Sequence, residues 1–149
     1  MAKLNYTTVI NAPREKVWKT LLDDQSYRQW TAPFHPGSYY KGSWEVGEKL
    51  LFIGPNDDGT EGGMVSTVAE NRYPEYISIK HLGMIDKGEE IYSGPQVDPW
   101  APSFENYTLN DKNGATEFVV EMTSPDEYKA SFDEKWPKAL AELKRLSEA

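Results

Sequence analysis

Apolar residues near the end of the chain recur at a spacing typical of one long helix. Steps of three and four place them on a single helical face. They are Tyr128, Phe132, Trp136, Leu140, Leu143 and Leu146. Ser124 followed by Glu127 forms a capping-box pattern with Pro125 at the first helical position, which predicts a helix over residues 124–148. Pro137 lacks an N–H, so we expect either a kink there or a short helix followed by a longer one.

The first thirty residues predict one strand and two short helices. Side chains alternate between two faces over residues 3–10, which indicates a strand. Pro13 then stands near the first position of a helix. The apolar face of this helix is formed by Val17, Trp18, Leu21 and Leu22. Asp23 or Asp24 begins a second short helix that runs to Trp30.

From Pro33 onward the pattern is that of β-structure. The expected strands cover residues 38–41, 48–53, 63–70, 76–82, 104–110 and 115–122. Turn signals rich in Gly, Pro, Asn and Asp separate most of them, so consecutive strands should pair antiparallel. Two strands have a clear inward face, formed by Ile77, Ile79 and His81 in one and by Thr116, Phe118, Val120 and Met122 in the other.

One connection, residues 83–103, is much longer than the other loops. Loops of this length in compact domains are usually functional or disordered. This one contains Ile85, Ile91, Tyr92 and Trp100, which would be costly to leave in water. We therefore expect residues 84–102 to form an ordered flap that covers an internal cavity.

The order of these elements predicts an α+β fold of the helix-grip type. In such a fold a curved antiparallel sheet wraps around the long C-terminal helix, and two short helices follow the first strand. The length of 149 residues suits a single domain over residues 1–149.

Charge and composition exclude several classes of partner. The net charge of -8 and a pI near 4.8 oppose binding to nucleic acid or to an anionic membrane. The sequence has no cysteine, which suits a reducing compartment. It also has no apolar run of membrane-spanning length and no signal-peptide pattern. We therefore expect a cytoplasmic protein that does not insert into a membrane. Two histidines, His35 and His81, without metal-ligand spacing do not predict a zinc site, and no cofactor is indicated.

Several segments resemble the START-like (Bet v 1-like) superfamily, in particular the branch named after the activator of the Hsp90 ATPase. The opening of that branch is similar to INAPREKVWKTL at residues 10–21. Its second helix is similar to YRQW at 27–30, its last hairpin to NYTL at 106–109 with GAT at 114–116, and its C-terminal helix to WPKALAELK at 136–144. The resemblance spans nearly the whole chain. Because its motifs are mainly structural, it supports the fold more strongly than it supports any function.

The resemblance implies a cavity between the last helix and the concave face of the sheet. Members of the superfamily bind lipophilic molecules there, and some carry out cyclisation or related chemistry. We therefore expect binding of a small, mostly hydrophobic molecule. The first alternative is a chaperone-associated domain that stimulates Hsp90, although the eukaryotic co-chaperones carry an additional N-terminal domain that this chain lacks. The second is a cyclase-like or hydrolase-like enzyme.

Two polar residues are candidates for chemistry in such a cavity. His81 ends the inward row of its strand and titrates near neutral pH, so it suits ligand contact or proton transfer. Glu105 alternates with Tyr107, and if both point inward Glu105 needs a partner such as His81. The competing interpretations are a hydrogen-bonded core histidine and a solvated glutamate at the strand end.

The aromatic content of 13% exceeds what a minimal core needs, so some rings should line the cavity. No set of residues predicts a catalytic centre. The predicted ligand-binding residues are Trp30, Phe34, Tyr39, Phe52, His81, Trp100, Glu105, Tyr107, Phe132 and Trp136.

Overall fold

The computed structural model describes residues 1–149. Its helices are α1 (Arg14–Leu22), α2 (Asp24–Trp30) and α3 (Lys129–Glu148), with a short 3-10 helix, η1 (Asp126–Tyr128), before α3. Its strands are β1 (Ala2–Ile10), β2 (Tyr39–Gly42), β3 (Lys49–Pro55), β4 (Glu61–Arg72), β5 (Tyr76–Asp86), β6 (Glu89–Ile91), β7 (Ser103–Lys112) and β8 (Ala115–Ser124). None of the helices is long and apolar enough to cross a membrane.

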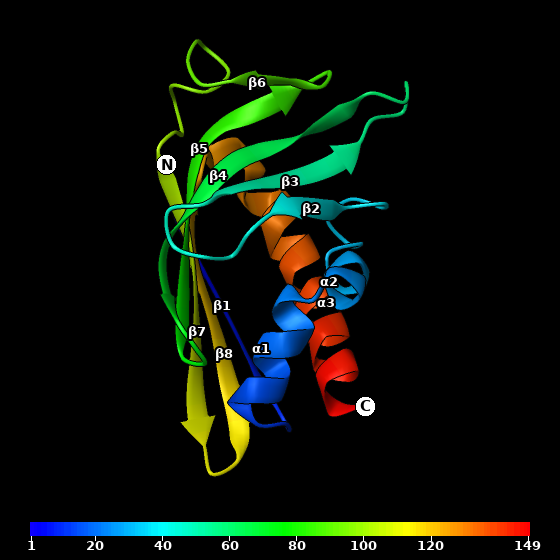
Figure 1. The fold of residues 1–149 in the computed structure, drawn as a ribbon, viewed down its shortest axis with the longest axis vertical. Coiled ribbons are helices and arrows are strands. Elements are labelled where there is room, and N and C mark those ends of the chain that lie inside the picture. Colours follow the sequence, from blue (N-terminus) through cyan, green and yellow to red (C-terminus); the bar gives the residue numbers. More distant parts are fainter.

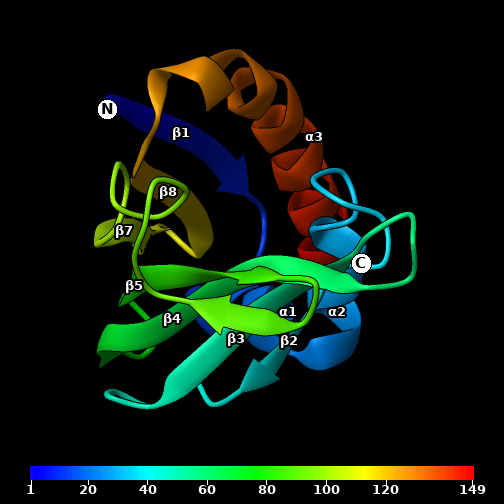
Figure 2. The ribbon, with the colours of Figure 1, turned by 90° about the horizontal axis from the view of Figure 1, so that it is seen from above.

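The strands form one antiparallel sheet in the order β1-β8-β7-β5-β4-β3-β2, and β6 pairs with β5 beside this path. All three helices lie on the same side of the sheet (Figure 1). Seen from above, the sheet curls so that β1 and β8 lie at one side of α3 while β2 to β5 cross at the other (Figure 2). The α+β helix-grip fold predicted from the order of elements is confirmed.

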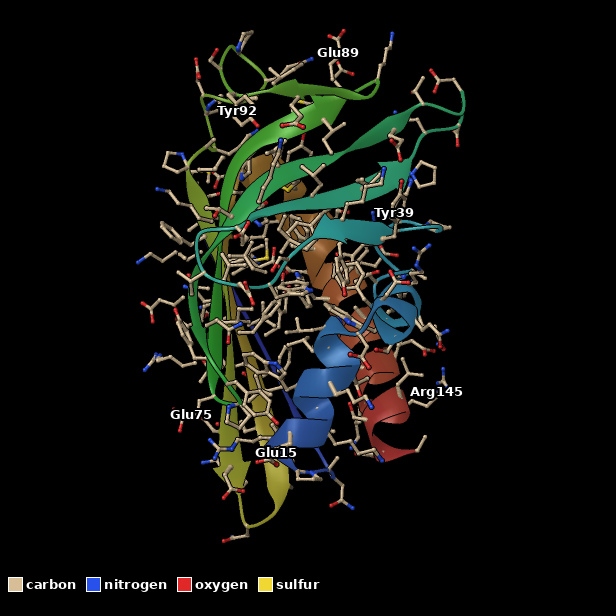
Figure 3. The ribbon with its side chains drawn as sticks, in the orientation of Figure 1. Glu15, Tyr39, Glu75, Glu89, Tyr92 and Arg145 are labelled. Carbon is tan, nitrogen blue, oxygen red and sulfur yellow. The ribbon has the colours of Figure 1, made fainter.

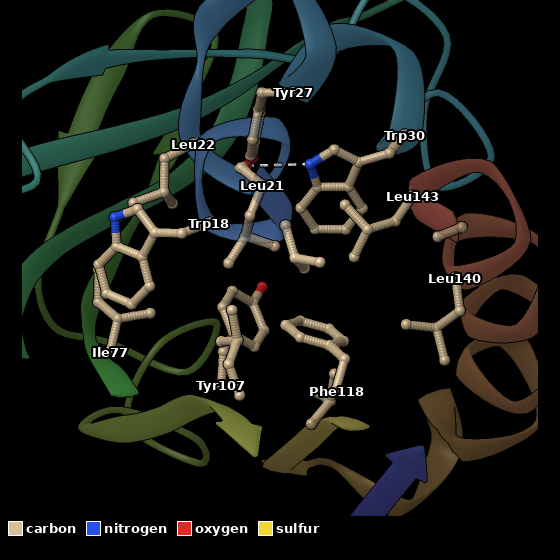
Figure 4. Close-up of a cluster of buried hydrophobic side chains, with 14 of the residues drawn as sticks. Trp18, Leu21, Leu22, Tyr27, Trp30, Ile77, Tyr107, Phe118, Leu140 and Leu143 are labelled. Carbon is tan, nitrogen blue, oxygen red and sulfur yellow. Dashed lines mark hydrogen bonds between the residues drawn. The ribbon is translucent and has the colours of Figure 1, made fainter. Parts of the chain in front are cut away.

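The space between the helices and the middle of the sheet is filled by a large apolar core. Twenty buried residues form it, and large rings contribute much of its volume (Figure 4). Trp136 of α3 stacks on Tyr6 of β1, and Trp30 donates a hydrogen bond from Nε1 to the carbonyl oxygen of Leu21 at 3.0 Å. Burying an indole is compatible with this core when its N–H finds such an acceptor. The inward rows predicted for β5 and β8 are buried as expected, apart from the partly exposed Met122.

The predicted start of the C-terminal helix is wrong. Ser124 is the last residue of β8 and pairs with Ala2 of β1, and its hydroxyl donates to the carbonyl oxygen of Pro125 at 3.2 Å instead of capping a helix. Because the ladder with β1 extends this far, the local capping signal is overridden. The long helix begins at Lys129. It continues through Pro137, so it is not divided into two helices there. Tyr128, predicted on the apolar face of the helix, lies before it and is 52% exposed.

The long connection after residue 82, expected to be a loop, begins with regular β-structure. Strand β5 continues to Asp86, and a two-residue turn with positive φ at Lys87 and Gly88 leads into β6. Two consecutive positive φ values match the right-handed twist of paired strands. The rest of the connection is ordered, since its residue Val97 is almost completely buried.

Candidate functional site

A cavity of about 320 Å³ lies between the connection from α2 to β2 and the concave face of β3 and β4. The cavity was expected between the last helix and the concave face, but no residue of α3 lines this one, because core side chains such as Trp136 fill that space. Its size is at the lower end of the range for small-molecule sites. Its apolar lining is Phe34, Phe52, Ile53 and Met64, and its remaining lining is His35, Ser38, Asn56, Gly54, Gly62 and Gly63. The cavity is open to solvent, and its walls mix apolar side chains with a few polar groups.

Close packing of a histidine on a glycine fixes one wall of this cavity. A Cβ atom added to Gly54 would lie 2.6 Å from Cδ2 of His35, so the ring sits directly on the backbone of β3. Nε2 of His35 lies 2.5 Å from the carbonyl oxygen of Pro55, at the end of the same strand. Only glycine leaves room for this ring, so the connection is anchored to the sheet here. His35 therefore has a structural role in the cavity wall.

A chain of four hydrogen-bonded side chains crosses the concave face next to the cavity. The hydroxyl of Ser66 lies 2.7 Å from Nδ1 of His81, and Nε2 of His81 lies 3.0 Å from Oε1 of Glu105. The hydroxyl of Tyr107 donates to the second carboxylate oxygen, Oε2. Ser66, His81 and Tyr107 are buried, while the side chain of Glu105 keeps 17% of its surface exposed. Glu105, between His81 and Tyr107, is thus the most exposed member of the chain.

The order of these groups lets His81 gain or lose a proton without losing a partner. In the neutral ring, Nε2–H donates to Glu105 and Nδ1 accepts from the hydroxyl of Ser66. In the protonated ring, both nitrogens donate, and the hydroxyl oxygen of Ser66 becomes the acceptor. A serine hydroxyl can turn to serve either state. The completely buried Ser66 has no access to a ligand, so it orients His81 and does not act as a nucleophile.

Two phenols respond to the charge on Glu105. Burial, reinforced by the negative charge of Glu105 and by the hydrogen bond to it, raises the pKa of Tyr107 well above its ordinary value. Burial and the same charge also raise the pKa of Tyr27 on α2. Both phenols therefore stay protonated at neutral pH, and Tyr107 remains a hydrogen-bond donor to the carboxylate.

Phe52 connects the cavity to this polar chain. It lines the cavity, and its ring centre lies 6.0 Å from the centre of the His81 ring and 6.1 Å from that of Tyr27. The edge-to-face arrangement with His81 buries one side of the histidine behind the phenylalanine. A molecule in the cavity would therefore lie against Phe52, with the polar chain behind it.

The structure places the predicted site residues in three groups. Phe34 and Phe52 line the cavity, and Phe132 packs near Phe34 with 6.4 Å between ring centres. His81, Glu105 and Tyr107 form the polar chain, and the structure does bring His81 and Glu105 into contact. Trp30 and Trp136 are buried in the core between α2, α3 and the sheet.

Tyr39 and Trp100 are not brought to this cavity. Tyr39 lies on β2 (Figure 3), where its hydroxyl donates to Glu61 and the guanidinium of Arg28 lies 5.0 Å from its ring centre. Trp100 donates from Nε1 to the carbonyl oxygen of Gln96 within its own loop. No residue of the predicted flap, 84–102, lines the cavity either. The flap is wrong as its cover, because β6 extends β5 away from the connection that holds Phe34.

Ser66 is a member of the polar chain that the sequence pattern did not single out. A register shift between Val65 and Ser66 brings Ser66 opposite His81, and such an irregularity is not visible in the sequence. The one feature of the sequence that could have pointed to Ser66 is the alternation of side chains along β4. It places Ser66 on the same face of the strand as Met64, which lines the cavity.

Replacing Ser66 by alanine should lower the free energy of unfolding by about 1–2 kcal/mol, because a buried hydrogen bond to His81 is lost. Chemical denaturation measures this value. The control is Ser93→Ala, which removes an exposed hydroxyl and should change stability little. Equal stability of the two variants would show that the Ser66 contact does not stabilise the fold.

A second cavity of about 450 Å³ lies along the free edge of β1, next to α3. Its lining is Asn5, Tyr6, Thr7, Thr8, Pro137, Leu140, Ala141 and Lys144. The amino group of Lys144 donates to the carbonyl oxygen of Val9 at 3.1 Å, and the carboxylate of Glu148 accepts from the backbone N–H of Asn11 at 2.8 Å. These two contacts cover one end of the edge.

No group of three or more His, Asp or Glu side chains that could share a metal ion occurs in the structure.

The geometry defines a START-like helix-grip domain with a solvent-open cavity and a polar chain beside it. The family described as Activator of Hsp90 ATPase homolog 1-like protein matches residues 11–148, and the chain belongs to this family. No protein with a curated description matches the sequence.

Solved structures with the same fold come from several bacteria. A protein from Mesorhizobium loti is 15% identical, with a TM-score of 0.72 over 97% of this chain and 96% of that one. The Aha1 dimer from Colwellia psychrerythraea is 18% identical, with a TM-score of 0.72 over 99% and 97%. A protein from Chromobacterium violaceum is 20% identical, with a TM-score of 0.68 over 100% and 99%. At these identities the likeness shows the fold alone.

Proposed function

We propose that this protein binds a small, mostly apolar molecule in the cavity between the α2–β2 connection and strands β3 and β4. The observation that carries the proposal is the solvent-open cavity of about 320 Å³, whose lining includes Phe34, Phe52, Ile53 and Met64. Phe34, Phe52 and Met64 are only partly buried there, although they lie against the concave face. Covering such side chains with an apolar molecule is favourable by about 25 cal/mol for each Å² removed from water.

The residues predicted from sequence have different parts in this proposal. Phe34 and Phe52 contact the apolar body of the molecule, and the His81 ring lies behind Phe52. His81 and Tyr107 hold the Glu105 carboxylate in place. Trp30 and Trp136 support the wall from the core and do not contact the molecule.

Native mass spectrometry of the protein, purified gently from its own host, tests the proposal. We expect a reproducible additional mass that disappears on denaturation, because a bound small molecule is released when the fold is lost. A protein that always shows its bare mass and also fails to bind the neutral fluorescent probe N-phenyl-1-naphthylamine would contradict the proposal.

Replacing Phe52 by alanine should weaken binding of N-phenyl-1-naphthylamine by about tenfold or more, because a large apolar contact is removed. A fluorescence titration measures the dissociation constant. The control is Phe104→Ala, which removes an exposed phenylalanine that does not line the cavity and should leave binding unchanged. Equal weakening in both variants would place the probe elsewhere.

Family membership favours a second candidate function, an interaction with a chaperone. The family takes its description from an activator of the Hsp90 ATPase. The test adds the protein to the Hsp90 homologue of its host and measures ATP hydrolysis. Stimulation that persists in Phe52→Ala would support an exposed face, and not the cavity, as the functional surface.

The hydrogen-bonded chain favours a third candidate, proton transfer to a bound substrate. Glu105 is its most exposed member, and it is hydrogen-bonded to His81, a residue type that often serves in general acid–base catalysis. Full turnover of an identified substrate by His81→Ala would rule out this role.

A further inference from the structure

Two paired glycines in the cavity wall are each covered by a flat polar side chain. Gly54 of β3 pairs with Gly62 of β4, and the ring of His35 lies on Gly54. The amide of Asn56 lies on Gly62 in the same way, because a Cβ atom added there would be 3.0 Å from Oδ1 and 3.4 Å from Nδ2. Asn56 lines the cavity, so its amide is part of the surface that a bound molecule meets.

Hydrogen bonds in the turn between β3 and β4, residues 56–60, fix the orientation of this amide. The hydroxyl of Thr60 donates to the carboxylate of Asp58 at 2.5 Å, and an ionised carboxylate can only accept. The hydroxyl oxygen of Thr60 is then the acceptor for Asn56, so the amide atom that faces it at 3.0 Å is the donor Nδ2. The amide oxygen Oδ1 is left on the side of Gly62, and no group of the protein donates to it.

The rest of the lining offers nothing to a charged ligand. None of the ten lining residues is Asp, Glu, Lys or Arg, so an ionised group would be desolvated there without a counter-ion, which is costly. Nε2 of His35 already faces the carbonyl oxygen of Pro55. The hydroxyl of Ser38 can donate or accept, so it sets no preference. Oδ1 of Asn56 only accepts, and it is therefore the lining atom that distinguishes one ligand group from another.

We propose that the molecule bound in the cavity is uncharged and carries a hydroxyl group, or another neutral hydrogen-bond donor, that binds Oδ1 of Asn56. This inference rests on the proposed function, since it names the ligand class for the same cavity. The apolar body of the molecule lies against Phe34 and Phe52 while its donor satisfies the amide oxygen. Thr60 is a positioning residue, because its hydroxyl holds Nδ2 and thereby keeps Oδ1 on the side of Gly62.

The test compares four probes that share one ring system: 4-phenylphenol, 4-methoxybiphenyl, biphenyl-4-carboxylate and biphenyl-4-ylmethylammonium. Each displaces N-phenyl-1-naphthylamine from the protein at neutral pH. The ether has the larger apolar surface, so burial alone would favour it over the phenol. We expect the wild type to bind the phenol about 3- to 10-fold more tightly than the ether, because only the phenol can donate to Asn56. Both ionised probes should bind at least about tenfold more weakly than the phenol.

Three variants locate this preference. Asn56→Ala should weaken phenol binding about 3- to 10-fold and change ether binding by less than about twofold. Thr60→Val should lower the ratio of phenol affinity to ether affinity, and Thr60→Ser, which keeps the hydroxyl, should retain it. A merely structural role of Thr60 would instead weaken both probes alike and leave the ratio unchanged. The control is Asn110→Ala, which removes an exposed amide of β7 that does not line the cavity and should keep the wild-type ratio.

The outcomes separate this inference from the proposed function. If the wild type binds the ether or either ion as tightly as the phenol, or if Asn56→Ala keeps the preference for the phenol, the inference is overturned. Binding of N-phenyl-1-naphthylamine would still leave the cavity proposal intact. A wild type that binds neither the fluorescent probe nor any of the four biphenyls would contradict both proposals. If Asn56→Ala does not fold, the ratio in Thr60→Val against Thr60→Ser decides: a difference supports the inference, and equal ratios overturn it.

Discussion

Replacing Trp136 by alanine should lower the free energy of unfolding by about 3–5 kcal/mol, the largest effect we expect from a single side chain of this core. Trp136 is 2% exposed and stacks on Tyr6 with 5.7 Å between ring centres. The Phe34 ring lies edge-to-face with it, with 4.8 Å between ring centres, so Trp136 also supports the cavity wall. For a chain of this length the change corresponds to a fall in melting temperature of about 10 °C.

The matched control for this change is Trp136→Phe. The indole Nε1–H of Trp136 is buried without a hydrogen-bond partner, so phenylalanine removes no bond and keeps most of the aromatic contact. We expect Trp136→Phe to cost less than half as much as Trp136→Ala. Thermal and urea unfolding measure both values. Equal losses in the two variants would mean that ring stacking at this position contributes little.

Replacing Gly63 by alanine should destabilise the fold by at least about 3 kcal/mol, through the backbone and not through lost contacts. Its φ of +144° is one that residues with a Cβ rarely adopt. A Cβ atom added there would lie 1.8 Å from the carbonyl oxygen of Phe52, in the paired strand β3. The β3–β4 ladder would have to separate where it forms the cavity wall, so binding of N-phenyl-1-naphthylamine should be lost too.

Gly59→Ala separates backbone strain from the steric clash. Gly59 also has a positive φ, +84°, but an added Cβ would meet nothing within 4 Å. This variant should cost only about 1 kcal/mol and leave probe binding unchanged. Urea unfolding and the fluorescence titration check both expectations. If Gly63→Ala is no less stable than Gly59→Ala, the close approach of β3 and β4 at this position is not required.

Periodicity in the sequence predicts the inward faces of this fold well. Trp136, Leu140 and Leu143 recur at helical spacing and are buried in α3, and Ile77 and Ile79 alternate along β5 and are buried there. These positions follow from local geometry, since one face of each element must meet the core. The alternation along β7 left open whether Glu105 points inward or is solvated, and the structure has it in contact with His81.

Features that depend on pairing between distant segments could not be predicted in the same way. Ser124 stays in a strand because Ala2 pairs with it, and no local signal contains that partner. Ser66 meets His81 because of a register shift in β4. The position of the cavity depends on how His35 packs on Gly54, which is a contact between a turn and a strand nineteen residues away in sequence. The fold was therefore more predictable than the site.

The most direct test of the central claim is a titration of the isotope-labelled protein with N-phenyl-1-naphthylamine, followed by NMR of the backbone amides. Binding in the cavity predicts the largest shift changes at residues 34–38, 52–54 and 62–64. Shift changes confined to β1 and α3 would place the ligand in the other cavity, and an unchanged spectrum would contradict the binding function altogether.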